Sequence, residues 1–335
     1  MKYLFIVFVL LMACSDSTET RKQRLLAQGN EMVVKQDYDE AEKYFEGALK
    51  LDSCFADASN NLGSLYFKRK EYGKAVQYYS HAISCRQQYR EAYFNRANAY
   101  YELHEYYSAL ADLSALTKVK DTSTVFFLQG LIHTKMRSFD AAIADFDKAL
   151  KLDVKNAEIW VNKGIVLFYQ KRNDEARTDL LKAIALNPKE PNAYNTMCLL
   201  EASEGHYIEA KDYINKALAL RADDAYFINN RGYINLMKNN LEDAVADIDR
   251  SIGLDPYNGW AYRNKGIYYL KMNQIDDALR LLNKAETVDK YIDNLQFYLG
   301  ECYFKKGDKQ QACAHYKLAF DAGELDAVEF GKLCK

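Results

Sequence analysis

The sequence predicts an all-α fold of consecutive helical hairpins, because one pattern repeats through almost the whole chain. The 335 residues include only 3 prolines and 15 glycines, too few turn formers for a protein built from β-hairpins. A constant period is the signature of a repeat architecture, in which each unit packs on its neighbours. An alanine recurs every 34 residues, with one interval of 33, at Ala41, Ala75, Ala109, Ala142, Ala176, Ala210, Ala244, Ala278 and Ala312.

Two further sets of mostly small residues keep this period. A glycine inside a helix costs roughly 0.5–1 kcal/mol relative to alanine, so recurrent helical glycines need a packing reason. We expect the small residues of paired helices to face one another and let the backbones approach closely. One set lies twelve residues before the alanines: Gly29, Gly63, Ala97, Gly130, Gly164, Cys198, Gly232, Gly266 and Gly300. The other lies seven residues after them: Ala48, Ala82, Leu116, Ala149, Ala183, Ala217, Ser251, Ala285 and Ala319. Large residues stand four positions after each alanine: Phe45, Tyr79, Leu113, Phe146, Leu180, Ile214, Ile248, Leu282 and Tyr316.

The N-terminal segment is expected to lie outside the repeats. Residues 1–13 have one early cation and an apolar run that is too short to span a bilayer but suits a signal peptide. Leu11-Met12-Ala13-Cys14 resembles a lipobox, so Cys14 is expected to carry lipid, including palmitate, and to become the mature N-terminus. Residues 14–21 are interpreted as the lipidated cysteine and a flexible polar tether. An ordinary cleavable signal is the alternative.

The repeats are predicted to span residues 22–326. Their starts are expected near residues 22, 56, 90, 123, 157, 191, 225, 259 and 293. Asn187-Pro188 and Asp255-Pro256 end second helices, because proline cannot continue a helix and disfavours it for the preceding residue. Residues 327–335 are predicted to form a short C-terminal capping helix.

The repeat resembles the tetratricopeptide repeat (TPR). The resemblance rests on Trp160…Gly164…Leu167…Ala176…Leu180…Ala183…Pro188, with small residues at motif positions 8, 20 and 27 and proline at 32. Position 7 departs from the usual leucine in four units, at Arg96, Lys163, Arg231 and Lys265. The resemblance implies a right-handed α-solenoid superhelix of nine TPR hairpins, whose first helices build a concave inner face.

Position 6 of the repeat supplies the first candidates for partner binding. The resemblance places this position on the inner face, and an asparagine amide offers both donors and an acceptor to the backbone of an extended peptide. The alternative is that asparagine is simply the common residue at this position of the family. The candidates are Asn61, Asn95, Asn162, Asn230 and Asn264.

Aromatic residues and an arginine near these asparagines are the second candidates. Aromatic and arginine side chains are enriched at the energetic centres of protein interfaces. Some of them could instead belong to the core between repeats. The candidates for peptide binding are Phe127, Phe168, Tyr226, Tyr233, Trp260 and Arg263.

No catalytic, cofactor or metal motif is present in the sequence. The five histidines are scattered over different units, and no Cys-x-x-Cys, His-Glu-x-x-His or phosphate-binding glycine loop occurs. A formal net charge of -2 gives no long-range attraction for nucleic acid. The chain is therefore not expected to be an enzyme, to hold a cofactor or metal, or to bind nucleic acid.

Two cysteine pairs are candidates for disulfide bonds. Cys54 precedes a first helix and Cys85 ends the second helix of the same hairpin, so antiparallel packing brings them together. Cys313 and Cys334 form a second candidate pair that would fasten the C-terminal cap. Cys198 occupies a buried small-residue position and is expected to be an inert packing residue.

These observations predict a membrane-tethered scaffold that binds an extended peptide or a partner protein on its concave surface. Its expected place is the bacterial cell envelope, lipid-anchored at the outer membrane or the periplasmic face. The alternatives are an accessory factor for envelope assembly or secretion, and a binding component or platform of an enzyme complex. The oligomeric state is left open.

Overall fold

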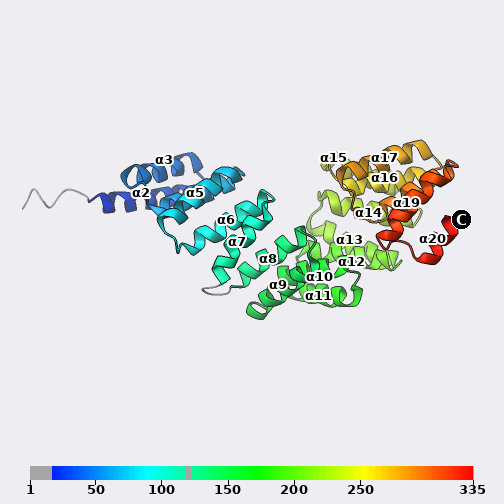
Figure 1. The fold of residues 1–335 in the computed structure, drawn as a ribbon, viewed down its shortest axis with the longest axis horizontal. Coiled ribbons are helices and arrows are strands. Elements are labelled where there is room, and N and C mark those ends of the chain that lie inside the picture. Colours follow the sequence, from blue (N-terminus) through cyan, green and yellow to red (C-terminus); the bar gives the residue numbers. More distant parts are fainter. Residues whose placement is uncertain (1–16, 118–121, 335) are drawn as a thin grey trace, which may run out of the picture. The chain divides into compact units, whose positions relative to one another are not determined.

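The computed structural model describes residues 17–117 and 122–334, and every regular element in these ranges is a helix (Figure 1). A boundary between Val154 and Lys155 divides the chain into an N-terminal and a C-terminal unit. The sequence predicts one uninterrupted array, because the 34-residue period continues from Ala142 to Ala176 across this boundary. The division falls in the turn between the fourth and fifth repeats.

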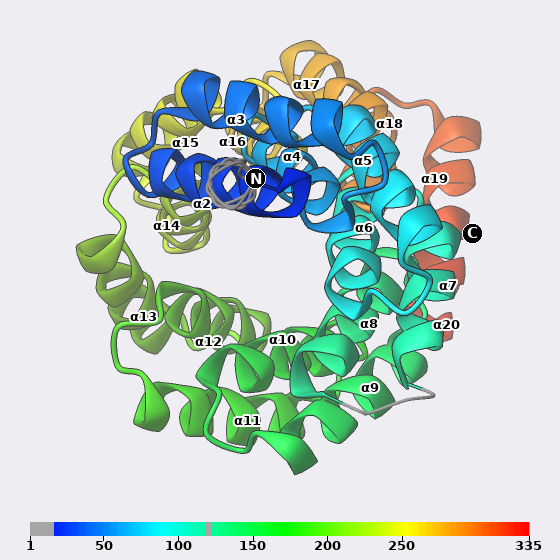
Figure 2. The ribbon, with the colours of Figure 1, turned by 90° about the vertical axis from the view of Figure 1, so that its left-hand side faces the viewer.

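Each unit is a series of helical hairpins. The N-terminal unit contains α2 (Thr18–Val34) with α3 (Tyr38–Leu51), α4 (Ala56–Lys68) with α5 (Tyr72–Cys85), α6 (Arg90–Glu102) with α7 (Tyr106–Thr117), and α8 (Ser123–Lys135) with α9 (Phe139–Leu152). The C-terminal unit contains α10 (Ala157–Tyr169) with α11 (Asn173–Leu186), α12 (Pro191–Ser203) with α13 (Tyr207–Leu220), α14 (Ala225–Met237) with α15 (Leu241–Leu254), α16 (Gly259–Lys271) with α17 (Ile275–Val288), α18 (Leu295–Lys305) with α19 (Lys309–Asp321), and the terminal α20 (Ala327–Leu333). Figure 2 shows the first pair, α2 and α3, side by side. The predicted all-helical solenoid of hairpins with a C-terminal helix is confirmed over the described residues.

The first helix begins earlier than the sequence analysis predicts. The hydroxyl of Ser17 accepts a hydrogen bond from the backbone N–H of Thr20, and Glu19 places a negative charge in the first turn. Both features stabilise a helix N-terminus. Residues 18–21 are therefore helical rather than part of a flexible tether. The predicted signal peptide and Cys14 lie outside the described residues.

The recurrent glycines accommodate large side chains of the second helix. A Cβ atom at Gly164 would lie 2.9 Å from Cγ of Leu180, and one at Gly29 would lie 2.4 Å from the ring of Phe45. The recurrent alanine of the same repeat approaches the glycine through its backbone. The carbonyl oxygen of Ala176 would lie 3.5 Å from a Cβ atom at Gly164. The expected close approach of the two helices is therefore present at Gly164 and Ala176, and the glycine also lies against the large residue of the second helix. The glycine leaves room for the residue sixteen positions later.

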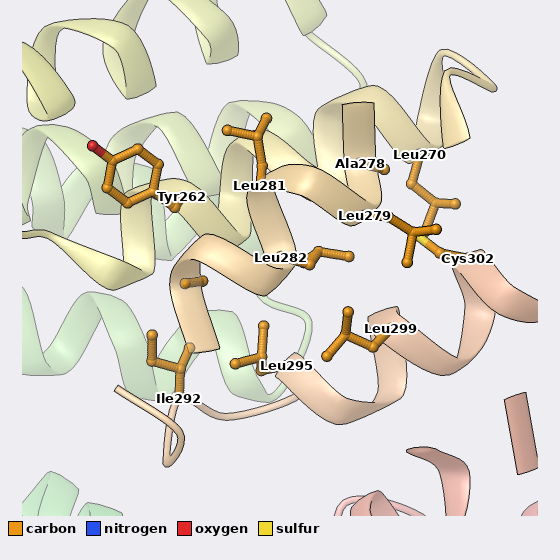
Figure 3. Close-up of a cluster of buried hydrophobic side chains, with 11 residues drawn as sticks. Tyr262, Leu270, Ala278, Leu279, Leu281, Leu282, Ile292, Leu295, Leu299 and Cys302 are labelled. Atoms are coloured by element: carbon orange, nitrogen blue, oxygen red, sulfur yellow. The ribbon is translucent and has the colours of Figure 1, made fainter. Parts of the chain in front are cut away.

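Apolar residues of successive helices complete the core between repeats. In the C-terminal unit, side chains of α16, α17 and α18 converge, with Leu282 of α17 facing Leu295 and Leu299 of α18 (Figure 3). All three are fully buried. Burial of apolar surface at each such junction joins one hairpin to the next.

The first helices lie closer together than the second helices. Within each unit every first helix contacts the first helix of the following repeat, as α14 and α16 do. The second helices of successive repeats make no comparable contacts in the described part of either unit. Each unit therefore curves with its first helices on the inner side, as the resemblance implies.

Cysteines fasten two places in the fold. The sulfur atoms of Cys54 and Cys85 are 2.05 Å apart, across the open end of the α4–α5 hairpin. Cys313 of α19 is bonded to Cys334, which follows α20. The ring of Phe330 in α20 stacks on Phe320 at 5.2 Å between centroids, so α20 covers the last hairpin as predicted. Burial raises the pKa of the Cys198 thiol to about 12, in keeping with an inert packing residue.

None of the described helices combines the length and apolar composition needed to cross a bilayer.

Substituting the two glycines of one repeat should change stability in opposite directions. A Cβ at Gly232 would lie 2.9 Å from Cγ1 of Ile248 and 3.2 Å from the carbonyl oxygen of Ala244, whereas one at Gly253 would meet nothing within 4 Å. We expect Gly232→Ala to lower the free energy of unfolding by about 1–3 kcal/mol, because the methyl group overpacks the hairpin. Gly253→Ala should raise it by about 0.5–1 kcal/mol. Urea denaturation followed by circular dichroism measures both, and a shift in the same direction would contradict the packing role of Gly232.

Candidate functional site

Four of the five position-6 asparagines connect neighbouring repeats, and three of these four do so through an asparagine at position 5 of the preceding repeat. The Nδ2 atom of Asn95 donates to Oδ1 of Asn60 at 3.0 Å, which joins α6 to α4. In the C-terminal unit the same bond joins first helices twice: Asn230 donates to Asn195 at 2.8 Å and Asn264 donates to Asn229 at 2.9 Å. Each acceptor lies 35 residues before its donor, at position 5 of the preceding repeat. These amides bridge the first helices.

Asn264 is buried between neighbouring first helices rather than exposed on their inner side. Its side chain is 0% exposed, and its partner Asn229 is 1% exposed. The Oδ1 atom of Asn264 also accepts from Nε and from a terminal nitrogen of Arg263. A peptide could reach Asn264 only if these buried hydrogen bonds were broken, so the expected peptide contact is not supported for this residue. The position-5 asparagines are the sequence signal that would have predicted the bridges.

The two remaining asparagines lie in other surroundings. Asn162 donates to the carbonyl oxygen of Glu158 in its own helix at 2.9 Å. Asn61 donates to Oδ1 of Asn30 at 2.7 Å, and both side chains remain at least partly exposed. Position 5 of the first repeat is Leu26, so Asn61 has no amide at the usual place and pairs with position 9 instead.

Three predicted residues meet on the first helices of the C-terminal unit. The guanidinium carbon of Arg263 lies 4.9 Å from the ring centroid of Trp260 and 5.2 Å from that of Tyr233. Arg263 itself is buried and donates to the backbone oxygen of Asp293 at 2.8 Å. A cation held against two aromatic faces is an attractive and rigid arrangement. Trp260 and Tyr233 stay half-buried, so part of each ring is open to a partner.

Tyr298 lies near Tyr233 and Arg263, although the sequence analysis did not select it. It occupies position 6 of the ninth repeat, and burial raises its pKa to about 12. Tyr226 lies apart from the cluster and is half exposed. Its pKa is raised by burial and by the nearby carboxylate of Asp255.

The other two aromatic candidates have ordinary packing neighbours. The half-buried Phe127, in the N-terminal unit, lies 6.0 Å from the ring of Phe146, which belongs to the hairpin core. Phe168, in the C-terminal unit, lies 6.1 Å from the ring of Tyr169.

The basic residues at position 7 have structural partners. Arg96 makes two hydrogen bonds to the buried carboxylate of Asp112, at 2.7 and 2.8 Å. Arg231 repeats this arrangement with Asp247. Each pair links the two helices of one hairpin, and it raises the pKa of the arginine. Each arginine thus spends two of its N–H groups on a carboxylate of its own hairpin.

One group of three described side chains has metal-ligand chemistry. Suitable atoms of Glu201, Glu204 and His206 lie within 4.8 Å of one another near the turn between α12 and α13. Arg177 already occupies this place as a cation, because it donates to Glu201 and, at 2.6 Å, to Glu204. The group is therefore a salt-bridge network rather than a candidate metal centre.

Replacing Asn264 should destabilise the protein far more than replacing Asn162. Asn264→Ala removes the donor to Oδ1 of Asn229 and the acceptor of Nε and one terminal nitrogen of Arg263, so we expect the free energy of unfolding to fall by about 2 kcal/mol. Asn162→Ala removes one bond within its own helix, so a change below about 0.5 kcal/mol is expected. Denaturant titrations of both variants give the comparison. Similar values for the two would argue against the bridging role.

Comparison with known proteins agrees with this architecture. The family described as "Tetratricopeptide repeat" matches residues 26–90, 127–191, 199–259 and 263–327. No match was found among curated proteins. These matched segments cover most of the chain and include members of both units.

Solved structures of low sequence identity share the fold. The APC/C hetero-tetramer Cut9–Hcn1 contains a chain of 15% identity with a TM-score of 0.63; the similarity covers 98% of this chain and 65% of that one. This chain thus spans about two thirds of that relative's length. The human IFIT1 dimer with m7Gppp-AAAA has 17% identity and a TM-score of 0.56, covering 78% of this chain and 67% of that one. The chain belongs to the tetratricopeptide repeat family, whose repeats form scaffolds for protein–protein interaction.

Proposed function

We propose that this chain is a membrane-tethered scaffold of the bacterial cell envelope that binds an extended peptide or a partner protein on the inner side of its first helices. The proposal of partner binding rests on the group formed by Trp260, Tyr233 and Arg263. Its two rings are partly exposed and are held by a buried cation, so little side-chain entropy remains to be lost on binding.

The proposed binding surface differs from the set of position-6 asparagines that the sequence analysis selected. Asn264 is omitted because it is fully buried, and Asn95 and Asn230 serve mainly as bridges between repeats. In the C-terminal unit, Tyr226 and Phe168 are the further candidates that retain exposed surface. Recognition is therefore proposed to depend on aromatic contacts more than on amide hydrogen bonds.

The membrane tether is proposed from the N-terminal sequence. A lipid on Cys14 would lie three residues before Ser17, which caps α2. A tether this short would hold the first repeat near the membrane surface, because each extended residue spans at most about 3.5 Å. Anchoring by lipid is consistent with described helices that are not suited to cross a bilayer.

A photo-crosslinking amino acid at position 226 should capture the partner, whereas one at position 181 should not. Tyr226 of the first helix α14 is 50% exposed, and Leu181 of the second helix α11 is 48% exposed, so the two sites are matched in accessibility. We expect p-benzoylphenylalanine at 226 to give a discrete adduct in cells, which Trp260→Ala weakens about tenfold or more. Gel shift and mass spectrometry provide the readout. Equal adducts from both sites would show that the partner does not bind preferentially to the inner side of the first helices.

Cys14→Ser should abolish incorporation of labelled palmitate, because the thiol is the proposed attachment site. Ser15→Ala is the matched control and should leave incorporation unchanged. The measurement is metabolic labelling of cells followed by purification of the chain. A wild-type chain without label would refute the lipid anchor while leaving the binding proposal intact.

A further inference from the structure

A small pocket lies between the first two repeats of the N-terminal unit. Its volume is 160 Å³. Phe45 and Leu65 in the lining are buried, and Val33 and Tyr38 are half-buried. A protein cavity of about 150 Å³ can hold a benzene molecule, so this pocket has room for one leucine- or phenylalanine-sized side chain. The lining comprises Asn30 and Val33 of α2, Tyr38 and Phe45 of α3, and Asn61, Ser64, Leu65 and Lys68 of α4. Figure 2 shows these three helices next to one another.

The two amides in the lining form a pair with unused hydrogen-bonding capacity. Asn61 spends one Nδ2 hydrogen on Oδ1 of Asn30. Among the described residues, Nδ2 of Asn30 and Oδ1 of Asn61 have no further partner. The Nδ2 group of Asn30 can therefore donate and Oδ1 of Asn61 can accept, and these two groups match the C=O and N–H of a single peptide group. If the nitrogen and oxygen of both amides were exchanged, the pair would still offer a donor and an acceptor to one peptide group.

A positive charge lies beside the amides. Lys68 is exposed, and its ammonium nitrogen is 5.5 Å from the centroid of the Tyr38 ring. The part of the chain that the structure describes offers it no carboxylate in an ion pair, whereas the adjacent Arg69 is bound to Asp39 and Glu42. An acidic side chain is therefore the favoured neighbour of whatever enters the pocket.

We propose that this pocket anchors an extended peptide through one leucine or phenylalanine side chain next to an acidic residue. The apolar side chain enters between Val33 and Leu65, the adjoining peptide group pairs with Asn30 and Asn61, and the acidic side chain faces Lys68. The inference rests on the proposed function, because it assigns partner chemistry to the first two repeats of the same scaffold.

Synthetic peptides can test the contributions of the ring and of the acidic side chain separately. The probes are acetyl-Ala-Phe-Asp-Ala-amide, the same peptide with Phe replaced by Ala, and the same peptide with Asp replaced by Lys. Each is titrated into the full mature chain while the methyl NMR signals of Val33 and Leu65 are followed. We expect saturable shifts with the first peptide, affinity lower by about tenfold or more without the ring, and affinity lower by about threefold with lysine. No shift with the first peptide, or equal affinity for all three, would overturn the proposal.

Two neighbouring valines supply a matched pair of variants. Val33→Phe places a ring in the pocket, while Val34→Phe adds the same ring to a side chain that is 83% exposed and outside the lining. We expect Val33→Phe to abolish peptide binding and Val34→Phe to retain it. Loss of binding in both would contradict the assignment. Lys68→Glu tests the charge without altering the interior, and it should reverse the preference between the aspartate and lysine peptides.

Other outcomes identify other occupants and separate this inference from the proposed function. A concentration-dependent dimer that Val33→Phe dissolves in sedimentation would assign the pocket to a second copy of the chain and overturn the peptide proposal. Crosslinking at position 226 reports on the C-terminal unit and does not involve the pocket. An adduct there with no peptide binding here would refute the pocket alone. Peptide binding without that adduct would refute the C-terminal surface instead.

Discussion

Seven of the nine hairpins depend on a large side chain of the second helix lying against a glycine of the first. Phe45, Phe146 and Tyr316 are fully buried in this way against Gly29, Gly130 and Gly300. Burial of a large apolar side chain stabilises by about 1.5–3 kcal/mol, which exceeds the conformational cost of one helical glycine. Where alanine or cysteine replaces the glycine, at Ala97 and Cys198, the residue sixteen positions later is aliphatic rather than aromatic, Leu113 and Ile214. Aromatic residues at the later position therefore lie only opposite glycine, although glycine also faces Leu180, Ile248 and Leu282.

Polar contacts supplement this apolar packing at two levels. Arg96–Asp112 and Arg231–Asp247 join the helices within a hairpin, while Asn229–Asn264 joins one repeat to the next. A buried polar group is costly unless it is hydrogen-bonded, so each pair favours the single arrangement in which both partners meet. The apolar contacts hold the hairpins together, and the polar pairs restrict how neighbouring first helices align.

The binding surfaces proposed for this scaffold lie where the repeat departs from its own pattern. In the N-terminal unit, Leu26 replaces the asparagine that would otherwise accept from Asn61, so Asn61 pairs with Asn30 beside a pocket. In the C-terminal unit, Arg263 takes the same repeat position and lies against two aromatic rings. Residues that follow the pattern are occupied in holding the repeats together. Next to the residues that break it, side chains such as Asn61 and Trp260 keep exposed surface for a partner.

The sequence alone determined the helical hairpins, their starts at residues such as Ala56 and Ala157, and the terminal helix, because these follow from small and large residues recurring at a constant period. Tertiary structure decided which groups meet. Whether the amides of Asn229 and Asn264 bond to each other depends on the rotation between neighbouring helices, and no single repeat contains that information. The same holds for the pocket beside Asn61, since it arises from how the second repeat is placed against the first.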